Sequence, residues 1–522
     1  MAKKQAKEKT IEVALWETAN KLRGTVEPSQ YKHVVLALIF LKFASDKFEE
    51  QRQKLIDDGK EKYVERPEFY NMNNVFFLKE KTRWTYIVSQ ARQNDIALII
   101  DSALHTIEED NEALKGALPN NYFSSLGLDT SKLAALISEI DSIDTLKDKE
   151  QDVIGRIYEY FLSKFAIAEG KGKGEFYTPK SIVNLIVELI EPYKGFIYDP
   201  CCGSGGMFVQ SIKFIEAHHG NQKEVSIYGQ ENINTTYKLA KMNLAIRGIS
   251  ANLGEKAANT FSNDLHKDLK ADFIMANPPF NQKVWREENE LLDDPRWKGY
   301  EVPPKSNANY GWILHMASKL SENGVAGFLL ANGALSGGGD EYKIRKQLIK
   351  NDLVEAILIL PQNMFYTTNI SVTLWILNKN KKEYVRAIHQ RNYRDRQKEI
   401  LFMDLREMGE PFEKKYIQFS EKDIRKIADT YHSWQCTDEL NSPYQDIPEF
   451  CYSAGIEEVR EKDYSLVPSR YIEFVNRDEE IDFDEKMKTL QQEIGELLQE
   501  EKKSREELLA VFKNLGYKIE LK

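Results

Sequence analysis

Short apolar runs alternate with helical segments from about residue 195 to residue 378, and this alternation limits the possible folds more than any other feature. The apolar runs are GFIYDP, VSIYGQE, ADFIMANPP, VAGFLLAN, LVEAILILP and VTLWILNK, separated by segments such as MFVQSIKFIEAHH and YGWILHMASKLSE. Strands that alternate with helices build a mostly parallel sheet with helices on both faces. We therefore predict a doubly wound α/β domain, in which a ligand lies outside the carboxyl ends of the strands.

Two helical regions flank this predicted domain. Residues 11–167 carry apolar residues at three- and four-residue spacing, and the glycine-rich hinge EGKGKGEFYTPKS follows them. Past Lys379 the alternation fades, but residues 484–509 again show helical spacing, with leucine and isoleucine on one face. This last helix either binds a partner or packs on its own domain. The predicted parts are a helical N-terminal domain (1–168), an α/β domain (169–475) and a helical C-terminal tail (476–522).

Composition argues against several classes of protein. The formal net charge of -10 disfavours a chain that grips nucleic acid over its whole surface, so such contacts should be local or shared with a partner. The 4 cysteines have neither zinc-site nor disulfide-framework spacing, and we expect no metal. We expect the cytoplasm, because no apolar stretch could cross a bilayer and MAKKQAKEKT precedes no signal-peptide core. No P-loop is present, so ATP hydrolysis is not expected.

The segment YDPCCGSGGMF places a glycine turn directly after the first predicted strand. The strand ends at Asp199, and Gly203, Gly205 and Gly206 form a turn that lets a ligand approach the backbone closely. Glu231 ends the next predicted strand, where this fold offers a carboxylate to the two hydroxyls of a ribose. The loop holds no cation for a phosphate, and Asp199 suits a cationic group such as the amino end of S-adenosylmethionine. Methyl transfer is therefore favoured over hydride transfer.

The segment ADFIMANPPFNQ ends another predicted strand with an amide, two prolines and an aromatic ring. Pro278 and Pro279 cannot donate to a strand ladder, so the strand stops before them. The Asn277 amide oxygen and the next carbonyl can accept both hydrogens of a flat exocyclic amine, and Phe280 can stack on the ring. Catalysis would then be chiefly orientation and electrostatics, with no covalent intermediate. The substrate would be a base swung out of a duplex, because the amine is unreachable inside the stack.

The motifs EFYTP, DPCCGSGG, YGQE and NPPF occur in this order and resemble those of the N6-adenine DNA methyltransferases. The resemblance is specifically to the modification subunit of type I restriction-modification systems. It extends through IGRIYEYFLSKFA, NANYGWILHM, LPQNMFYTTNISVTLWIL and SRYIEF, and so covers most of the chain. It implies a site-specific adenine DNA methyltransferase with a helical N-terminal domain, a Rossmann-like S-adenosylmethionine-dependent domain and a helical tail.

The resemblance also implies roles for individual residues. The segment that closes over the methionine part of the cofactor would be Glu175, Phe176, Tyr177, Thr178, Pro179 and Lys180. The cofactor loop would be Asp199, Gly203, Ser204, Gly205 and Gly206, with Glu231 as the ribose ligand. The residues that hold and stack the target adenine would be Asn277, Pro278 and Phe280, with Pro279 between them. The family usually has an acidic residue on the cofactor adenine; this chain departs there, with Asn259 aligned and Asp264 nearby.

Partners follow from the same resemblance. A separate specificity subunit would read the duplex, two copies of this chain would bind it, and a motor and nuclease subunit would join for cleavage. Consistent with this, only a modest stretch follows Lys379, where a self-sufficient enzyme would carry its recognition domain. Two other functions stay open. The chain could methylate a protein amide side chain, or it could be a catalytically silent assembly subunit.

Overall fold

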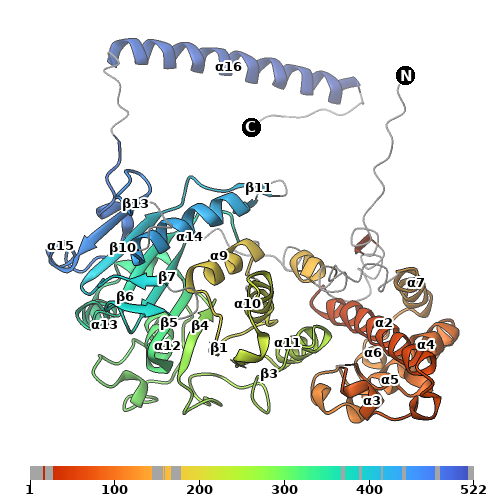
Figure 1. Cartoon of the computed structure of the whole chain (residues 1–522). Helices are drawn as coiled ribbons and strands as arrows, with labels where there is room; N and C mark the ends of the chain where they lie inside the picture. Colours follow the sequence, from red (N-terminus) through yellow and green to blue (C-terminus); the bar gives the residue numbers. More distant parts are fainter. Residues whose placement is uncertain are drawn as a thin grey trace. The chain divides into compact units, whose positions relative to one another are not determined.

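The structure is a computed structural model of the 522-residue chain, shown in Figure 1. It describes residues 16–17, 28–73, 75–143, 157, 159–165, 178–365, 371–386, 391–412, 416–437, 443–475 and 483–514. The chain divides into two compact units, Met1–Ile472 and Glu473–Lys522. Among the described residues, no helix combines the length and the apolar character needed to cross a membrane.

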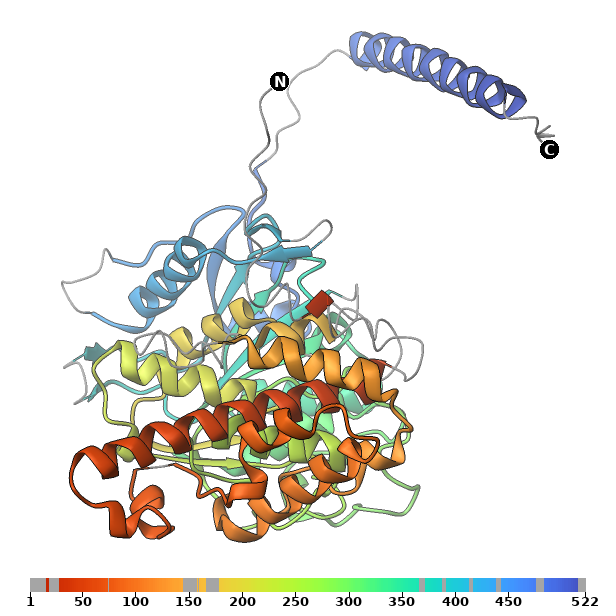
Figure 2. The same ribbon diagram turned by 90° about the vertical axis from the view of Figure 1, so that its right-hand side faces the viewer.

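The N-terminal region is helical, as the sequence predicted. Its longest helix, α2, buries almost completely the apolar run Val34–Leu41 (Figure 2, long red helix). The short helix α6 is fixed by Asp101, whose carboxylate accepts hydrogen bonds from three successive N–H groups at 122–124. The helices are α2 (Pro28–Asp57), α3 (Glu68–Asn71), α4 (Trp84–Gln90), α5 (Ile96–Asp110), α6 (Tyr122–Ser125) and α7 (Thr130–Asp141).

The next part is built on a nine-stranded sheet with the order β13-β10-β6-β7-β5-β4-β1-β2-β3. Strands β3, β2, β1, β4 and β5 are parallel to one another, whereas β7 runs antiparallel to both of its neighbours, β5 and β6. The strands are β1 (Gly195–Asp199), β2 (Val225–Gly229), β3 (Ala251–Asn252), β4 (Ala271–Ala276), β5 (Leu320–Ala331), β6 (Val354–Ile359), β7 (Val372–Asn378), β10 (Glu399–Asp404) and β13 (Cys451–Gly455).

Helices cover both faces of the sheet, which confirms the predicted doubly wound fold. Alternate residues of β4 enter different cores: Phe273 and Met275 pack on one face, and Ile274 and Ala276 on the other. The first face is covered by α9 (Lys180–Ile190), α10 (Gly206–Ala217), α11 (Asn234–Ile246) and α14 (Glu421–Gln435). The second face is covered by α12 (Asn309–Lys319), α13 (Gly339–Lys350) and α15 (Ile456–Glu461).

The strand order reverses beside β1, and this reversal determines where a ligand can bind. The chain runs from β1 outward through β2 to β3 and then returns to place β4 on the other side of β1. Connections therefore leave the carboxyl ends of β1 and β4 in opposite directions, which opens a crevice between them. Asp199 ends β1, and Asn277 follows the last residue of β4.

Beyond Lys379 the structure adds elements that the sequence pattern did not predict individually. Strands β10 and β13 extend the main sheet, and α14 begins with a capping box in which Ser420 and Asp423 bond each other's backbone N–H. Two hairpins lie outside the main sheet: β8 (Tyr384–Arg386) with β9 (Arg391–Tyr393), and β11 (Glu410–Phe412) with β12 (Tyr416–Gln418).

The second compact unit contains one long helix, α16 (Phe483–Asn514). Its exposed apolar side chains include Leu490, Ile494, Leu497 and Leu498, which recur at three- and four-residue intervals. Charged residues occupy most of the remaining positions.

The N-terminal helices pack against α11 of the sheet domain. Leu239, Met242 and Ile246 of α11 belong to the N-terminal hydrophobic core rather than to the sheet's own core. Lys238 and Lys241, on the same helix, donate hydrogen bonds to backbone carbonyls at Leu118 and Lys115, at 3.1 Å and 2.9 Å. The N-terminal helices are therefore joined to the helix that follows the β2 end of the crevice.

Candidate active site

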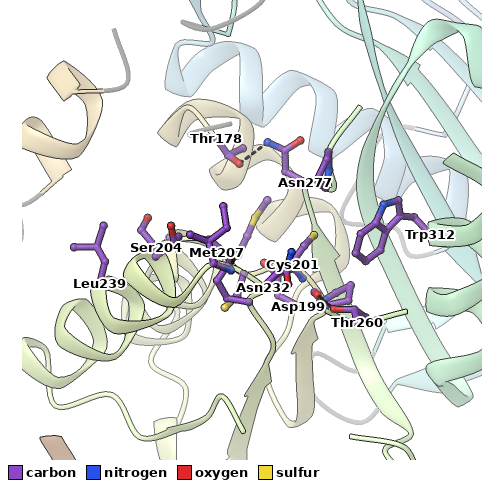
Figure 3. A pocket seen from close by; sticks show the side chains of 18 of the residues that line it. Thr178, Asp199, Cys201, Ser204, Met207, Asn232, Leu239, Thr260, Asn277 and Trp312 are labelled. Atoms are coloured by element: carbon purple, nitrogen blue, oxygen red, sulfur yellow. Dashed lines mark hydrogen bonds between the residues drawn. The ribbon is translucent and has the colours of Figure 1, made fainter. Parts of the chain in front are cut away.

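A cavity of about 210 Å³ lies at the carboxyl ends of β1, β2 and β4 (Figure 3). Most of its wall comes from the sheet domain, and Lys32, Leu162 and Phe165 reach it from the N-terminal region. Its other lining residues are Thr178, Val183, Asp199, Pro200, Cys201, Cys202, Gly203, Ser204, Gly206, Met207, Glu231, Asn232, Ile233, Thr236, Leu239, Asn259, Thr260, Phe261, Asn277, Pro279, Gln282 and Trp312.

The glycine turn between β1 and α10 forms one side of the cavity. Gly203 and Gly205 have φ of 53° and 79°, in the left-handed region that favours glycine, and Gly205 is the N-cap of α10. A Cβ added at Gly203 or Gly206 would meet no atom within 4 Å, so the backbone there is open to the cavity. Gly203, Ser204 and Gly206 line the wall, whereas Gly205 turns the chain behind it. This arrangement allows a ligand to approach the backbone closely.

Asp199 is a buried carboxylate in the cavity wall. It is 2% exposed, and one of its oxygens accepts a hydrogen bond from the Cys201 N–H at 3.0 Å. Burial raises the pKa of Asp199 to about 7, and the nearby Glu231 carboxylate adds to this effect, while the bond from Cys201 opposes it. A cation bound beside Asp199 would favour its charged form.

Glu231 joins the glycine turn to the beginning of α11. Its two carboxylate oxygens accept separate backbone hydrogen bonds, from Gly203 N–H at 3.0 Å and from Ile233 N–H at 2.8 Å. These bonds fix the carboxylate in the cavity wall at the end of β2. A carboxylate oxygen can accept more than one hydrogen bond, so this group can also accept from a ligand hydroxyl.

Asn277 is held by the segment that precedes α9. Its side-chain Nδ2 donates to Thr178 Oγ1 at 2.9 Å, the bond drawn as a dashed line in Figure 3. This bond leaves Oδ1, which is buried and has no hydrogen-bond partner among the described residues. Thr178 therefore fixes the orientation of the amide and keeps its acceptor oxygen available.

The remaining residues of the predicted catalytic turn differ in position. Pro279 lines the cavity with Asn277, whereas Pro278 and Phe280 are not part of its lining. Phe280 is 8% exposed, and its ring meets that of Phe365 edge-on at a centroid distance of 5.8 Å. The structure thus brings the Asn277 amide to the cavity but leaves the Phe280 ring out of the lining.

The predicted segment over the methionine part is described only in part. Glu175, Phe176 and Tyr177 lie outside the described residues. Thr178 lines the cavity, but Pro179 and Lys180 do not, since Pro179 is the N-cap of α9 and Lys180 its first residue. The Lys180 ammonium instead lies 3.7 Å from the Glu159 carboxylate.

The two candidates for the cofactor adenine are separated by the structure. Asn259 lines the cavity, and its Oδ1 accepts hydrogen bonds from the N–H groups of Phe261 and Ser262 at 2.8 and 3.3 Å. Asp264 is not in the lining; its carboxylate forms an ion pair with Lys319 at 2.6 Å. Burial acts to raise the pKa of Asp264, but the Lys319 hydrogen bond is among the interactions that bring it below its usual value.

A partly buried arginine supports the wall beside Asn259. Arg296 donates to the carbonyls of Thr260 and Phe261 at 3.0 and 2.7 Å. Asp294 holds the guanidinium through two bonds, at 2.7 and 2.6 Å. Behind it lies His315, whose pKa is lowered to about 3, first by burial and then by the charge of Arg296. A neutral imidazole at this position can accept a hydrogen bond from the guanidinium.

Several lining residues were not predicted from the sequence. Ile233, Thr260, Phe261, Gln282 and Trp312 reach the cavity from different loops and helices. Among these residues, only Ile233 could have been predicted from its neighbours, because it is an apolar residue two positions after Glu231. The Gln282 Oε1 and Trp312 Nε1 atoms are buried and, like Asn277 Oδ1, have no partner among the described residues. Three unpaired polar atoms among the lining residues indicate a site for a polar ligand.

The adjacent cysteines favour packing over nucleophilic catalysis. Cys201 and Cys202 line the cavity and form no disulfide. Burial, together with the carboxylates of Asp199 and Glu231, raises the pKa of both thiols well above the usual value. A thiolate, the reactive form, is therefore disfavoured here.

The comparisons with known proteins agree with this geometry. A family model described as "N-6 DNA Methylase" matches residues 149–480, and one described as "HsdM N-terminal domain" matches residues 11–140. The chain is 45% identical over 431 residues to the type I restriction enzyme HindI methylase subunit of Haemophilus influenzae, covering 81% of this chain and 92% of that protein. It is 37% identical over 530 residues to the MjaIX methylase subunit of Methanocaldococcus jannaschii, covering 97% and 92%.

Solved structures show the same fold. A type I restriction-modification methyltransferase subunit from Streptococcus thermophilus superposes with a TM-score of 0.72 at 24% identity, covering 89% of this chain and 99% of that one. The predicted family is thus confirmed, because one family model spans more than half of the sequence and the relatives match over most of their length. The chain belongs to the N-6 DNA methylase family, among the methylase subunits of type I restriction enzymes.

Proposed function

We propose that this chain transfers a methyl group from S-adenosylmethionine to the N6 amine of adenine in DNA, as the methylating subunit of a type I restriction-modification complex. The observation that carries the proposal is the Asn277 amide, whose Oδ1 is buried and unpaired among the described residues, at the cavity between β1 and β4. A buried acceptor without a partner is costly, and the amine of an adenine would satisfy it.

The cavity has the donor and acceptor groups that S-adenosylmethionine requires. We propose that Glu231 accepts from the two ribose hydroxyls and that the open backbone at Gly203 and Gly206 lies against the ligand. Asp199 would pair with the cationic amino group, which would favour its charged form despite burial. On the adenine side we propose Asn259 rather than Asp264, because Lys319 already pairs with the latter. When bound, the cofactor supplies an electrophilic methyl group on a sulfonium.

The chain's own residues would act by orientation. Asn277 Oδ1 and the Pro278 carbonyl would each accept a hydrogen bond from one N–H of the adenine amine. Thr178 accepts from Asn277 Nδ2 and so keeps Oδ1 facing that amine. The nitrogen lone pair is then directed at the methyl group. An amide oxygen is not a base, so the displaced proton leaves to water after transfer. Phe280, which follows the lining residue Pro279, would stack on the target ring, and that ring must be swung out of the duplex to reach the site.

The partners proposed for this chain follow from its family and from its charge. With a net charge of -10, much of the phosphate contact would come from a separate specificity subunit that reads the DNA sequence. We propose that two copies of this chain join one such subunit, and that α16 supplies part of the contact through its exposed leucines. A motor and nuclease subunit would complete the cleaving complex. The cytoplasm, where its DNA substrate would be found, stays the predicted compartment.

The direct test is transfer of labelled methyl from S-adenosylmethionine to duplex DNA, followed by nucleoside analysis. The assay compares this chain alone with this chain plus the specificity subunit encoded beside it. We expect label in N6-methyladenine only when both chains are present. Label with this chain alone would contradict the proposed dependence on a partner, and label in protein but not in DNA would contradict the substrate.

A further inference from the structure

The loop that follows the catalytic turn, residues 281–308, is held in place at both ends. Asn309 accepts from the Asn281 N–H at 3.1 Å and donates from its own amide to Asn281 Oδ1 at 3.0 Å. Farther along, Trp285 Nε1 donates to the Pro304 carbonyl at 2.9 Å. Arg286, 9% exposed, donates to several carbonyls of the same loop. These hydrogen bonds therefore fix the conformation of the loop.

Val284 lies in this loop, close in sequence to residues of the cavity wall. Gln282, two residues before it, lines the cavity, and Trp285, directly after it, packs its ring 4.4 Å from the ring of the lining residue Phe261. Trp285 is 5% exposed, whereas Val284 is 78% exposed. The Val284 side chain thus stands in solvent, between a residue that lines the cavity and a residue that packs on its wall.

Val284 carries two energetic costs. Its φ is 51°, which for a β-branched residue is a strained conformation. Its apolar side chain is also left in water. Strain retained beside a functional site is often part of the mechanism, and an exposed apolar side chain there suits an apolar partner surface. Lys283, which is also exposed, adds a positive charge next to Val284. We call Lys283 and Val284 the tip of the loop.

We propose that Val284 is a wedge that enters the base stack where the target adenine is swung out, while Lys283 contacts a flanking phosphate. This inference rests on the proposed function. An apolar side chain inserted between bases fills the gap that the extruded base leaves and lowers the cost of keeping it out. Among the acidic residues beyond Val284, Glu288 is paired with Lys305, which offsets its negative charge. The partner that the tip recognises is therefore the flat apolar face of a stacked base.

The test uses Val284→Ala in the complete complex of this chain with its specificity subunit. Val385→Ala is the matched control, because Val385 is 67% exposed and lies in β8, outside the cavity lining. Single-turnover methylation is measured on a matched duplex and on a duplex in which the target adenine faces a mismatched base. A mispaired base costs less to extrude, so it needs the wedge less.

We expect Val284→Ala to slow methylation of the matched duplex by about tenfold or more and to approach the wild-type rate on the mismatched duplex. Val284→Leu serves as the second variant, and its retained bulk should preserve the matched-duplex rate. Val385→Ala should equal wild type on both substrates.

If Val284→Ala slowed methylation equally on the two duplexes, or on neither, the proposal that Val284 acts as a wedge would be overturned. Loss of specificity-subunit binding in this variant would overturn it too, because the tip would then be a protein contact. Failure of the wild type to methylate either duplex would instead overturn the proposed function.

Discussion

Replacing Asp199 by asparagine should stabilise the ligand-free protein while weakening cofactor binding. Burial raises the pKa of Asp199 from 3.8 to about 7. Between these two values the folded state binds more protons than the unfolded state, so stability falls as pH rises through this window. This pKa difference of about 3 units, at about 1.36 kcal/mol per unit, corresponds to about 4 kcal/mol. Above pH 7 the folded protein loses this full amount of stability by burying the charged carboxylate. Asparagine has the same shape and can still accept from the Cys201 N–H.

The assay is urea unfolding of wild type and Asp199→Asn without ligand, at pH 5 and pH 8. We expect the variant to be more stable at pH 8, and its advantage to be smaller by about 3 kcal/mol at pH 5, where the wild-type carboxyl is already mostly protonated. Calorimetric titration should show weaker S-adenosylmethionine binding by the variant, because the anionic partner is lost. A stability difference independent of pH would refute the assigned burial cost, and unchanged cofactor affinity would refute the proposed ion pair.

Three further variants test separate parts of the site. Glu231→Gln should weaken cofactor binding about tenfold or more in calorimetry, because its NH₂ would face a backbone N–H; wild-type affinity would contradict the ribose role. Thr178→Val should lower the methyl-transfer rate about tenfold with unchanged cofactor affinity, whereas Thr178→Ser should retain the rate; equal rates in both would argue against amide orientation. Arg296→Lys should raise the cofactor Kd severalfold, because a lysine cannot reproduce the paired bonds to Thr260 and Phe261; an unchanged Kd would exclude this support.

The sheet could be predicted because its strands carry strong local signals. Ala271–Ala276 is an apolar run followed by two prolines, and Gly195–Asp199 is followed by a glycine turn. In both cases neighbouring residues predict the strand and the point where it ends. The strand β10 was missed although five of its six residues are buried, because short polar hairpins surround it and hide the alternation. Local pattern alone does not show that such a strand joins a sheet whose first strand begins at Gly195.

The same contrast holds in the site. Asn277, Glu231 and the glycine turn were predictable because a doubly wound fold places ligand groups directly after particular strands. Trp312 comes from the first turn of α12, and Lys32 comes from the N-terminal region, so only tertiary packing brings them to the cavity. The proposed preference for Asn259 over Asp264 likewise depends on the structure, since the Asp264 ion pair with Lys319 joins residues far apart in sequence.

The measurement that tests the central claim most directly is single-turnover methyl transfer by Asn277→Ala at saturating cofactor, within the complex. Asn323→Ala, which removes an exposed asparagine of β5, is the control. We expect Asn277→Ala to bind S-adenosylmethionine as wild type does but to lose N6-adenine methylation by about a hundredfold or more, because the role proposed for Asn277 is to orient the reacting amine. Methylation at the wild-type rate by Asn277→Ala would contradict the role proposed for this amide.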